Sequence, residues 1–210
     1  MSQTSTAYPI NLSIDYPDRN LNRLTTFFRI FTVIPIVIII GLLSSASYEW
    51  EGASGEAYKY AAAGLVFLPL VLMILFRQKY PKWWFDWNLA LTKFTFRVGS
   101  YFLLLRDEYP STDEEQSVHI EIPYPDVKKD LNRWMPLVKW LLVIPHVIIL
   151  AFLMAGLVIC TFITWFIILI TGSYPKGIFD FVVGTMRWYL RVYAYAFLLV
   201  TDEYPPFSLD

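Results

Sequence analysis

The residues best suited to chemistry form a line of charge along one predicted helix. Between residues 82 and 101, three basic side chains and one acidic side chain fall within about 40° of one direction, on a helix that turns 100° per residue. Basic groups at a cytoplasmic membrane surface attract acidic lipid headgroups, at roughly 1 kcal/mol each. This first charged line predicts an anionic-lipid site, or alternatively a solvated face whose aspartate neutralises the neighbouring bases. Its members are Lys82, Asp86, Lys93 and Arg97.

A second charged line repeats the first with the same order of charges. Most of the remaining circumference of both helices is aromatic or aliphatic, which is typical of a helix lying in the membrane surface. A third membrane span is the alternative for each helix, but it would bury three charges at roughly 2.5–3.5 kcal/mol each. The second line consists of Lys176, Asp180, Arg187 and Arg191. The predicted headgroup ligands are Lys82, Lys93, Arg97, Lys176, Arg187 and Arg191.

Four more basic residues lie where predicted membrane spans begin. Arg29 follows Arg23 by six residues, and Lys139 follows Arg133 by the same spacing. Six residues of helix rise about 9 Å, within reach of long side chains that extend to the headgroups. Membrane anchoring is the simpler interpretation. The alternative is that these four residues line a site at the cytoplasmic mouth of the membrane spans.

Signatures of catalysis are absent from the sequence. There is no P-loop, GxSxG, HExxH or CxxC pattern, and Cys160 is the only cysteine. His146 follows Pro145 inside an apolar run and is expected to be a hydrogen-bonded packing residue. The adjacent acids of each Asp-Glu-Tyr-Pro block point in different directions on a strand and have no identifiable partner base. We therefore expect no catalytic residue, no metal, no cofactor and no enzymatic activity.

Composition indicates a membrane protein. Of 210 residues, 56% are hydrophobic and only 17% are charged, against about 25% charged in soluble domains. Residues 140–171 contain no Asp, Glu, Lys or Arg, and this run is too long for one span of roughly 20 residues but suited to a tight pair. We expect spans at about 24–43 and 58–76, and again at about 134–154 and 157–171, with a turn near Gly156.

Matching blocks in the same order divide the chain into two tandem copies. Tyr-Pro-Asp, Leu-Asn-Arg, Val-Ile-Pro, Tyr-Pro-Lys and Asp-Glu-Tyr-Pro each occur once in residues 1–110 and once in residues 119–210, with a linker at 111–118. Each copy is predicted to hold a transmembrane helical hairpin and an interfacial amphipathic helix, at about 82–101 or 176–194. Short strands are expected at 8–14, 101–106, 117–122 and 195–200, forming a small sheet that joins the ends of each copy.

The distribution of basic residues predicts the orientation. Of 17 Lys and Arg, only Lys59 falls in the polar stretch between the first two spans. Because cytoplasmic loops collect Lys and Arg, both termini and the strands are expected in the cytoplasm. The fold class is therefore a mainly α, multi-pass membrane protein with short cytoplasmic β-strands. Its partners are expected to be membrane lipids, and other membrane-protein subunits or a second copy, while the net charge of −1 indicates no nucleic acid.

Several runs in the second half carry a family resemblance. They are Val-Ile-Pro-His at 143–146, Tyr-Pro-Lys-Gly-Ile-Phe-Asp-Phe-Val-Val-Gly at 174–184, Arg-Trp-Tyr-Leu-Arg-Val at 187–192 and Thr-Asp-Glu-Tyr-Pro-Pro-Phe-Ser-Leu at 201–209. They resemble a bacterial membrane family catalogued as domain-of-unknown-function family 4389, here in two tandem copies. The first copy departs from the pattern at Ile36 and at Ser111-Thr112. The resemblance implies the bacterial inner membrane and supplies no activity or functional residues.

These observations predict a non-enzymatic inner-membrane protein that acts as an accessory or scaffold subunit. It is expected to bind anionic lipid through the charged lines at its cytoplasmic face. The alternative function is a small channel or facilitator. That alternative requires several copies, because two hairpins enclose too little space for a pore.

Overall fold

The computed structural model describes residues 8–18, 20–44, 47–51, 57–61, 69–112 and 114–210. Within them the chain is mainly helical, as predicted, with two short antiparallel sheets. The elements are β1 (Asn11–Ile14), α1 (Arg23–Ser44), β2 (Ser47–Glu51), β3 (Ala57–Ala61), the π-helical turn η1 (Met73–Arg77), α3 (Lys82–Phe102), β4 (Val118–Glu121), α4 (Val127–Asp130), α5 (Met135–Leu142), α6 (Ile144–Thr171), α7 (Lys176–Tyr193) and the π-helical turn η2 (Ala194–Leu198).

Helix α6 is uninterrupted. It runs through Gly156 for 28 residues, which is about 42 Å at 1.5 Å per residue. The predicted turn near Gly156 is therefore wrong, and so is the division into spans at 134–154 and 157–171. One glycine costs a helix only about 1 kcal/mol, and no proline follows Pro145 in this run. The helix ends instead at Gly172, which adopts the left-handed conformation at φ 78°.

In the first half, α1 lies close to the predicted span of 24–43. The second predicted span, 58–76, falls partly outside the described residues. Within them, 57–61 form β3, and 69–77 are helical and end in η1. Strands β2 and β3 pair as an antiparallel hairpin in the polar stretch that follows α1.

The two amphipathic helices agree with the prediction to within one residue. Helices α3 and α7 each begin directly after a Tyr-Pro pair, with Pro81 or Pro175 at the position before the first turn. The second half has one more residue between Tyr195 and Asp202 than the first half has between the matching tyrosine and aspartate. The extra residue falls at η2, where a π-helical turn accommodates it.

The strand predictions are right for two segments and wrong for two. Strands β1 and β4 lie in the predicted segments 8–14 and 117–122, but they pair with each other, with Leu12 opposite Ile120. The sheet therefore joins the two halves instead of the ends of one copy. Residues 101–106 and 195–200 form helix ends, turns and η2. Tertiary context overrides their β-propensity, because the apolar sides of α3 and α7 are buried to their ends.

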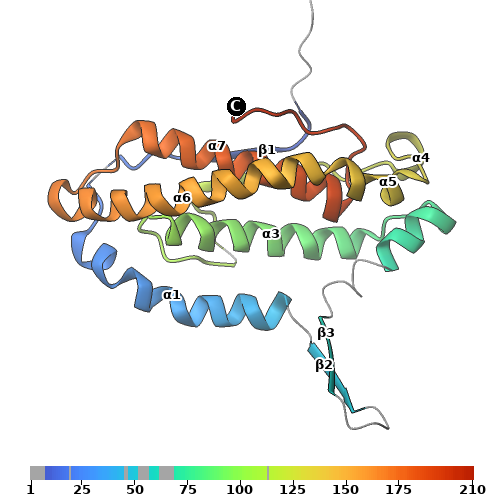
Figure 1. Ribbon diagram of the computed structural model, residues 1–210, viewed down its shortest axis with the longest axis horizontal. Helices are drawn as coiled ribbons and strands as arrows, with labels where there is room; N and C mark the ends of the chain where they lie inside the picture. The colour runs from blue at the N-terminus through green and yellow to red at the C-terminus, as the bar shows by residue number, and fades with distance from the viewer. Residues whose placement is uncertain (1–7, 19, 45–46, 52–56, 62–68, 113) are drawn as a thin grey trace, which may run out of the picture.

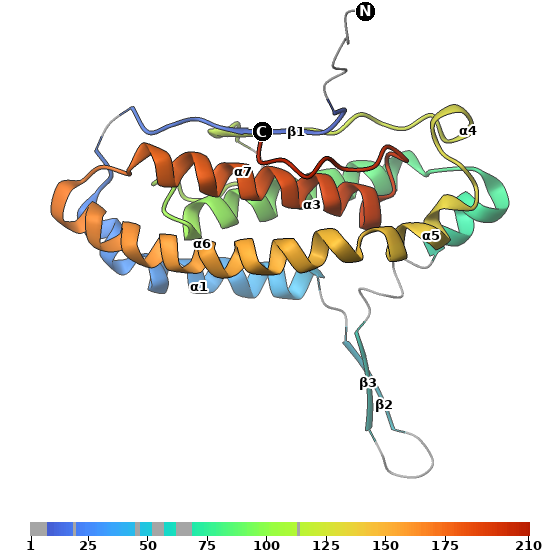
Figure 2. The same ribbon diagram turned by 45° about the horizontal axis from the view of Figure 1, so that its top comes forward.

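The elements stack in three layers (Figures 1 and 2). Helices α1 and α6 lie against each other in the first layer. In the second layer α3 packs on α1 and α7 packs on α6, and in the third layer β1 and β4 cover α7 and α3. The main core includes Leu12 and Ile120 of the sheet and Val182 and Leu190 of α7, so it lies between the second and third layers.

The exposed hydrophobic side chains of α1, α5 and α6 form an apolar face on the outer side of the first layer. Phe31 is 65% exposed, Phe152 76% and Ile170 75%. By length and composition, residues Arg23–Gly41 of α1 and the whole of α6 are able to cross a membrane. Monomeric soluble proteins rarely expose so continuous an apolar surface.

Candidate functional site

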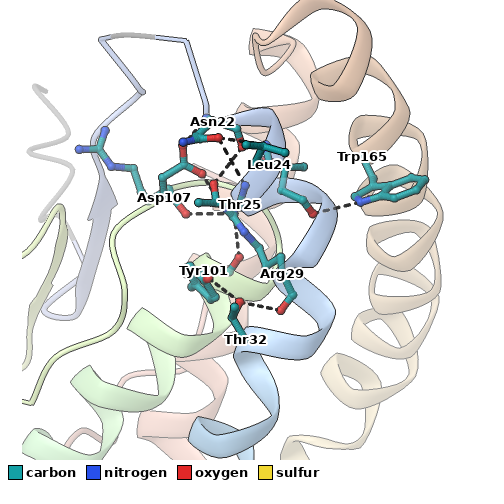
Figure 3. Close-up of polar contacts among 10 residues, drawn as sticks. Asn22, Leu24, Thr25, Arg29, Thr32, Tyr101, Asp107 and Trp165 are labelled. Atoms are coloured by element: carbon teal, nitrogen blue, oxygen red, sulfur yellow. Dashed lines mark hydrogen bonds and ion pairs between the residues drawn. The ribbon is translucent and has the colours of Figure 1, made fainter.

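A buried arginine ties α1 to the segment that follows α3. Arg29 is 2% exposed, and its guanidinium forms an ion pair with Asp107. It donates hydrogen bonds of 3.0 Å to the carbonyl oxygens of Tyr101 and Arg106. The guanidinium carbon also lies 4.5 Å from the centroid of the Tyr101 ring (Figure 3). We call Arg29, Tyr101 and Asp107 the first clamp.

The second half makes the same contacts with a lysine. Lys139 of α5 is fully buried, and its Nζ lies 2.7 Å from Oδ1 of Asp202. It donates a hydrogen bond of 2.6 Å to the carbonyl oxygen of Thr201 and lies 4.8 Å from the centroid of the Tyr195 ring. We call Lys139, Tyr195 and Asp202 the second clamp. Its members occupy the sequence positions that match the first.

Each clamp aspartate also fixes the start of a helix. Asp107 Oδ2 accepts a hydrogen bond of 2.7 Å from the backbone N–H of Asn22, and Asp202 Oδ2 accepts one of 2.5 Å from Asn132. The asparagine side chains accept from the backbone N–H two residues later, at 2.9 Å and 3.0 Å. For Asn22, which directly precedes α1, this is the contact of an N-cap residue, while Asn132 makes it in the turn that precedes α5. The repeated Leu-Asn-Arg and Asp-Glu-Tyr-Pro blocks are therefore parts of one contact.

The clamps correct the interpretation of the four basic residues at the span entrances. Arg29 and Lys139 do not extend to headgroups, because a carboxylate inside the protein neutralises each of them. Arg23 and Arg133 are exposed. The two clamps lie toward opposite ends of the molecule (Figure 1), so the four residues do not gather around one mouth.

The arginines of the second charged line bind the chain's own carbonyl groups. Arg187 donates to the carbonyl oxygens of Leu12 at 2.9 Å and Leu209 at 3.2 Å. Arg191 donates to the carbonyl oxygen of Asp210. Burial lowers the pKa of Arg191, and the charge of Arg187 lowers it further. Within the described residues, the hydrogen bonds of both side chains are with backbone carbonyls and not with the aspartate of the charged line, and they hold β1 and the C-terminal segment on α7.

The first charged line is used in part in the same way. Arg97 donates a hydrogen bond of 2.7 Å to the carbonyl oxygen of Ser111. Lys82 forms an exposed ion pair of 3.1 Å with Asp86, while Lys93 is half-buried. Lys176 of the second line is exposed. Lipid binding by Lys82, Lys93 and Lys176 stays a prediction.

A segment of the second half matches a known family. Residues 133–208 match the model of a family described as Domain of unknown function (DUF4389). The match supports the family resemblance and covers one copy, in the second half. No curated protein and no solved structure matches the chain. The DUF4389 match begins at Arg133 and includes Lys139, Tyr195 and Asp202, so it contains the whole second clamp.

Tyrosines of the Tyr-Pro blocks join the two halves of the chain. The hydroxyl of Tyr16 donates to the carbonyl oxygen of Tyr174, and that of Tyr124 donates to the carbonyl oxygen of Tyr80 at 2.6 Å. The Tyr80 hydroxyl donates in turn to Leu198 at 2.8 Å. In the sequence these blocks are recognisable only as repeats, and their contacts are not. Their repetition was the available signal, but a repeat does not reveal which copy a side chain will contact.

His146 lies within the DUF4389 segment and is fully buried. Its Nδ1 accepts a hydrogen bond of 3.0 Å from Nε1 of Trp188. Its ring stacks on Phe207, with 4.0 Å between centroids. The prediction of a hydrogen-bonded packing residue is confirmed. Among the described residues, no group of three or more His, Cys, Asp or Glu side chains is arranged to hold a metal ion.

Proposed function

We propose that this chain is a non-enzymatic membrane scaffold whose helices α1, α5 and α6 lie flat in one leaflet. The observation that carries the proposal is the separation of the two outer layers. The apolar face lies on one side of the α3–α7 layer, and the β1–β4 sheet, whose exposed side chains are polar, lies on the other (Figure 2). When α1, α5 and α6 lie in the plane of the leaflet, the apolar face contacts lipid and the sheet on the opposite side stays in water.

An upright α6 conflicts with the sheet. The helix is about 42 Å long, while the hydrocarbon core is about 30 Å thick. The β1–β4 sheet packs against α7, which runs alongside α6, so an upright α6 would carry the sheet to membrane depth. The sheet has two unpaired edges and exposed polar groups on Asn11, His119 and Glu121. Open edges exposed to lipid do not occur in the hydrocarbon region.

The matching contacts support two tandem copies related by an approximate two-fold rotation. The clamps share the ion pair with aspartate, the bond to the carbonyl oxygen before that aspartate and the contact with a tyrosine ring. Tyr16 and Tyr124 make reciprocal contacts with the opposite half. The antiparallel pairing of β1 with β4 fits the same relation. In this arrangement the first copy contributes α1 to the first layer, α3 to the second and β1 to the third. The second copy contributes α5 and α6, α7, and β4 to the same three layers.

The charged side of this body is proposed to face the cytoplasm of a bacterial cell. The described Lys and Arg outside β3 would lie on that side or at its edge, in keeping with the preference of basic residues for the cytoplasmic surface. The termini would then be cytoplasmic, as the sequence predicts. The bacterial inner membrane is the location that the family resemblance implies.

Cysteine labelling of the two ends of the α5–α6 line tests the flat arrangement. In a Cys160→Ala background, Arg133→Cys and Ser173→Cys place single thiols at exposed positions flanking the helices. A membrane-impermeant maleimide should label both in inverted vesicles and neither in intact spheroplasts, because both ends lie on one side. Phe162→Cys, which replaces a side chain of the apolar face that is 64% exposed, should stay unlabelled in both preparations.

Labelling of the two α6 ends from opposite sides would overturn the flat arrangement. The competing arrangement, in which α1 alone crosses the membrane, is favoured by one observation. The β2–β3 hairpin leaves the helix layer on the side away from the β1–β4 sheet (Figure 2) and contains Glu49, Glu51 and Lys59. If α1 crosses, Ser47→Cys should be labelled in spheroplasts and Arg23→Cys only in inverted vesicles.

A further inference from the structure

A cavity lies between two Tyr-Pro turns, one from each half. It has a volume of about 650 Å³ and is lined by Tyr80-Pro81 and Tyr124-Pro125, with Lys79 and Lys128 beside them. This volume lies within the range of ligand pockets, roughly 300–1,000 Å³. Its lining includes residues of η1 and α4, and α4 lies with α5 at one end of the molecule (Figures 1 and 2). We call this cavity the Tyr-Pro pocket.

Positive charge gathers around the Tyr-Pro pocket. Lys79 and Lys128 line it and are exposed. Arg133 reaches it through Gln78, a lining residue whose Oε1 accepts a hydrogen bond of 3.1 Å from the guanidinium. Lys82 lies over the ring of Tyr124, with Nζ 5.6 Å from the ring centroid. Arg77 precedes Gln78 in the chain and is also exposed.

The carboxylates near the pocket are already engaged. Asp126 pairs with Lys129 at 3.3 Å, and its side chain accepts a hydrogen bond from the backbone N–H of Lys128. Asp130 accepts a hydrogen bond from the backbone N–H of Asp126 at 2.9 Å. Asp86 pairs with Lys82. The five basic side chains at the pocket therefore outnumber the three carboxylates beside it, and an anion entering the pocket would meet an excess of positive charge.

Exposed apolar side chains lie beside the same pocket. Met73 lines it, and Phe76, three residues on in η1, is 74% exposed. A ligand that fits both surfaces has an anionic group at one end and hydrocarbon at the other. Anionic phospholipids have this chemistry, and basic pockets beside membrane helices bind their headgroups.

We propose that the Tyr-Pro pocket binds the headgroup of an anionic phospholipid, with Lys79 and Lys128 facing its phosphate. The proposal rests on the proposed function, since a bilayer lipid reaches this pocket from the leaflet that holds the apolar face. It differs from the headgroup site expected from the charged lines, because the arginines of those lines bind backbone carbonyl groups.

A lipid titration of the purified full chain tests the pocket. The protein in neutral detergent is titrated with dioleoyl phosphatidylglycerol or dioleoyl phosphatidylcholine, and its thermal unfolding is followed by tryptophan fluorescence. A ligand that binds only the folded state raises the unfolding temperature, so phosphatidylglycerol should do so at lower concentration than phosphatidylcholine. Each surface cation is worth about fivefold in affinity for an anionic lipid. The variant Lys79→Gln/Lys128→Gln should therefore need about 25-fold more phosphatidylglycerol.

The control removes a basic charge from the other end of the molecule. Arg23→Gln changes an exposed residue where α1 begins and should titrate like the unmodified protein. A need for about fivefold more phosphatidylglycerol in Arg23→Gln would show that any surface cation counts alike and would overturn the pocket. An unmodified protein that responds alike to both lipids would overturn it as well. Inorganic phosphate is titrated as a third arm, and an equal effect of phosphate alone would overturn the assignment to lipid.

The two proposals fail separately. If the ends of α5–α6 are labelled from one side and the phosphatidylglycerol response is not selective, only the pocket is lost. If the ends are labelled from opposite sides while the Lys79→Gln/Lys128→Gln variant still loses its response, the flat arrangement is lost and the lipid site remains. The midpoint of unfolding in detergent alone, compared among the three proteins, verifies that the substitutions leave the fold intact.

Discussion

At the scale of single residues, the most informative groups are the two buried cations. Removing a lysine or arginine from water carries a large desolvation cost, which only a close partner offsets. Asp107 and Asp202 provide that partner from segments that follow α3 and α7. Because the same aspartates bind the N–H groups of Asn22 and Asn132, each clamp fixes a helix start and a distant loop together.

Removing one clamp aspartate should destabilise the protein strongly. Asp202→Ala leaves the charge of Lys139 buried without its carboxylate, and breaking such a pair costs about 3–5 kcal/mol. Thermal unfolding in detergent measures the loss. Asp86→Ala is the control, because its ion pair with Lys82 is exposed and worth about 0.3–0.5 kcal/mol. Equal effects of the two substitutions would contradict the role of the clamp.

Gly184 is required by the close approach of the C-terminal segment to α7. A Cβ at this position would lie 2.7 Å from the carbonyl oxygen of Leu209. Gly184→Ala should therefore destabilise the fold, by about 1–3 kcal/mol as for other overpacked sites. Gly177→Ala in the same helix meets nothing within 4 Å and should be neutral or stabilising by up to about 1 kcal/mol. Chemical denaturation of both variants compares them, and a Gly184→Ala protein as stable as Gly177→Ala would refute the contact.

At the scale of elements, α6 shows why an apolar run was misread. A 32-residue uncharged run was divided because a spanning helix needs only about 20 residues. The limit of about 20 residues applies only to a helix that is perpendicular to the membrane. A helix in the membrane plane has no such length limit, and local sequence around Gly156 contains no strong helix terminator.

A proline at residue 156 distinguishes a continuous helix from a turn. Gly156→Pro should destabilise α6 by about 3 kcal/mol or more, because proline removes a hydrogen bond and clashes with the preceding turn. Gly156→Ala should be tolerated, since its Cβ would lie 3.7 Å from Phe181, an ordinary contact. Unfolding temperatures of the two variants in the same detergent measure the difference. A turn at this position would instead tolerate proline well.

At the scale of the whole molecule, the two halves are interlocked. Strand β1 pairs with β4, Tyr16 contacts Tyr174, and Arg187 of the second half binds Leu12 of the first. The strand of each half therefore pairs with that of the other half. The tyrosine of each Tyr-Pro-Asp block, Tyr16 or Tyr124, also donates a hydrogen bond to the other half. The chain is better described as one folded unit than as two independent domains.

Interlocking predicts that the halves stay together after the linker is cut. A specific protease site inserted after Thr112 should be cleavable, because the flanking residues are in an irregular segment. The two fragments should then co-elute from a size-exclusion column in mild detergent and separate only in denaturing detergent. Separation in mild detergent would show that the contacts between halves are too weak to define one unit.

The sequence by itself determined the local features of this protein. The pattern of charged and apolar residues predicted α3 and α7 to within a residue, and alternation predicted β1 and β4. These features depend on neighbours along the chain, through propensity, proline geometry and the helix or strand period. Composition also predicted membrane spans, and the structure has two helices that are long and apolar enough to cross a membrane.

The tertiary structure decided which residues meet. The sequence could not reveal that Arg29 and Lys139 would find aspartates 78 and 63 positions away, or that three arginines of the charged lines would bind backbone carbonyl groups. Nor could it distinguish pairing within a copy from pairing between copies, since both bury the same faces of β1 and β4. Such choices depend on the competition among distant partners for a buried charge or a free strand edge, and that competition exists only once the chain has folded.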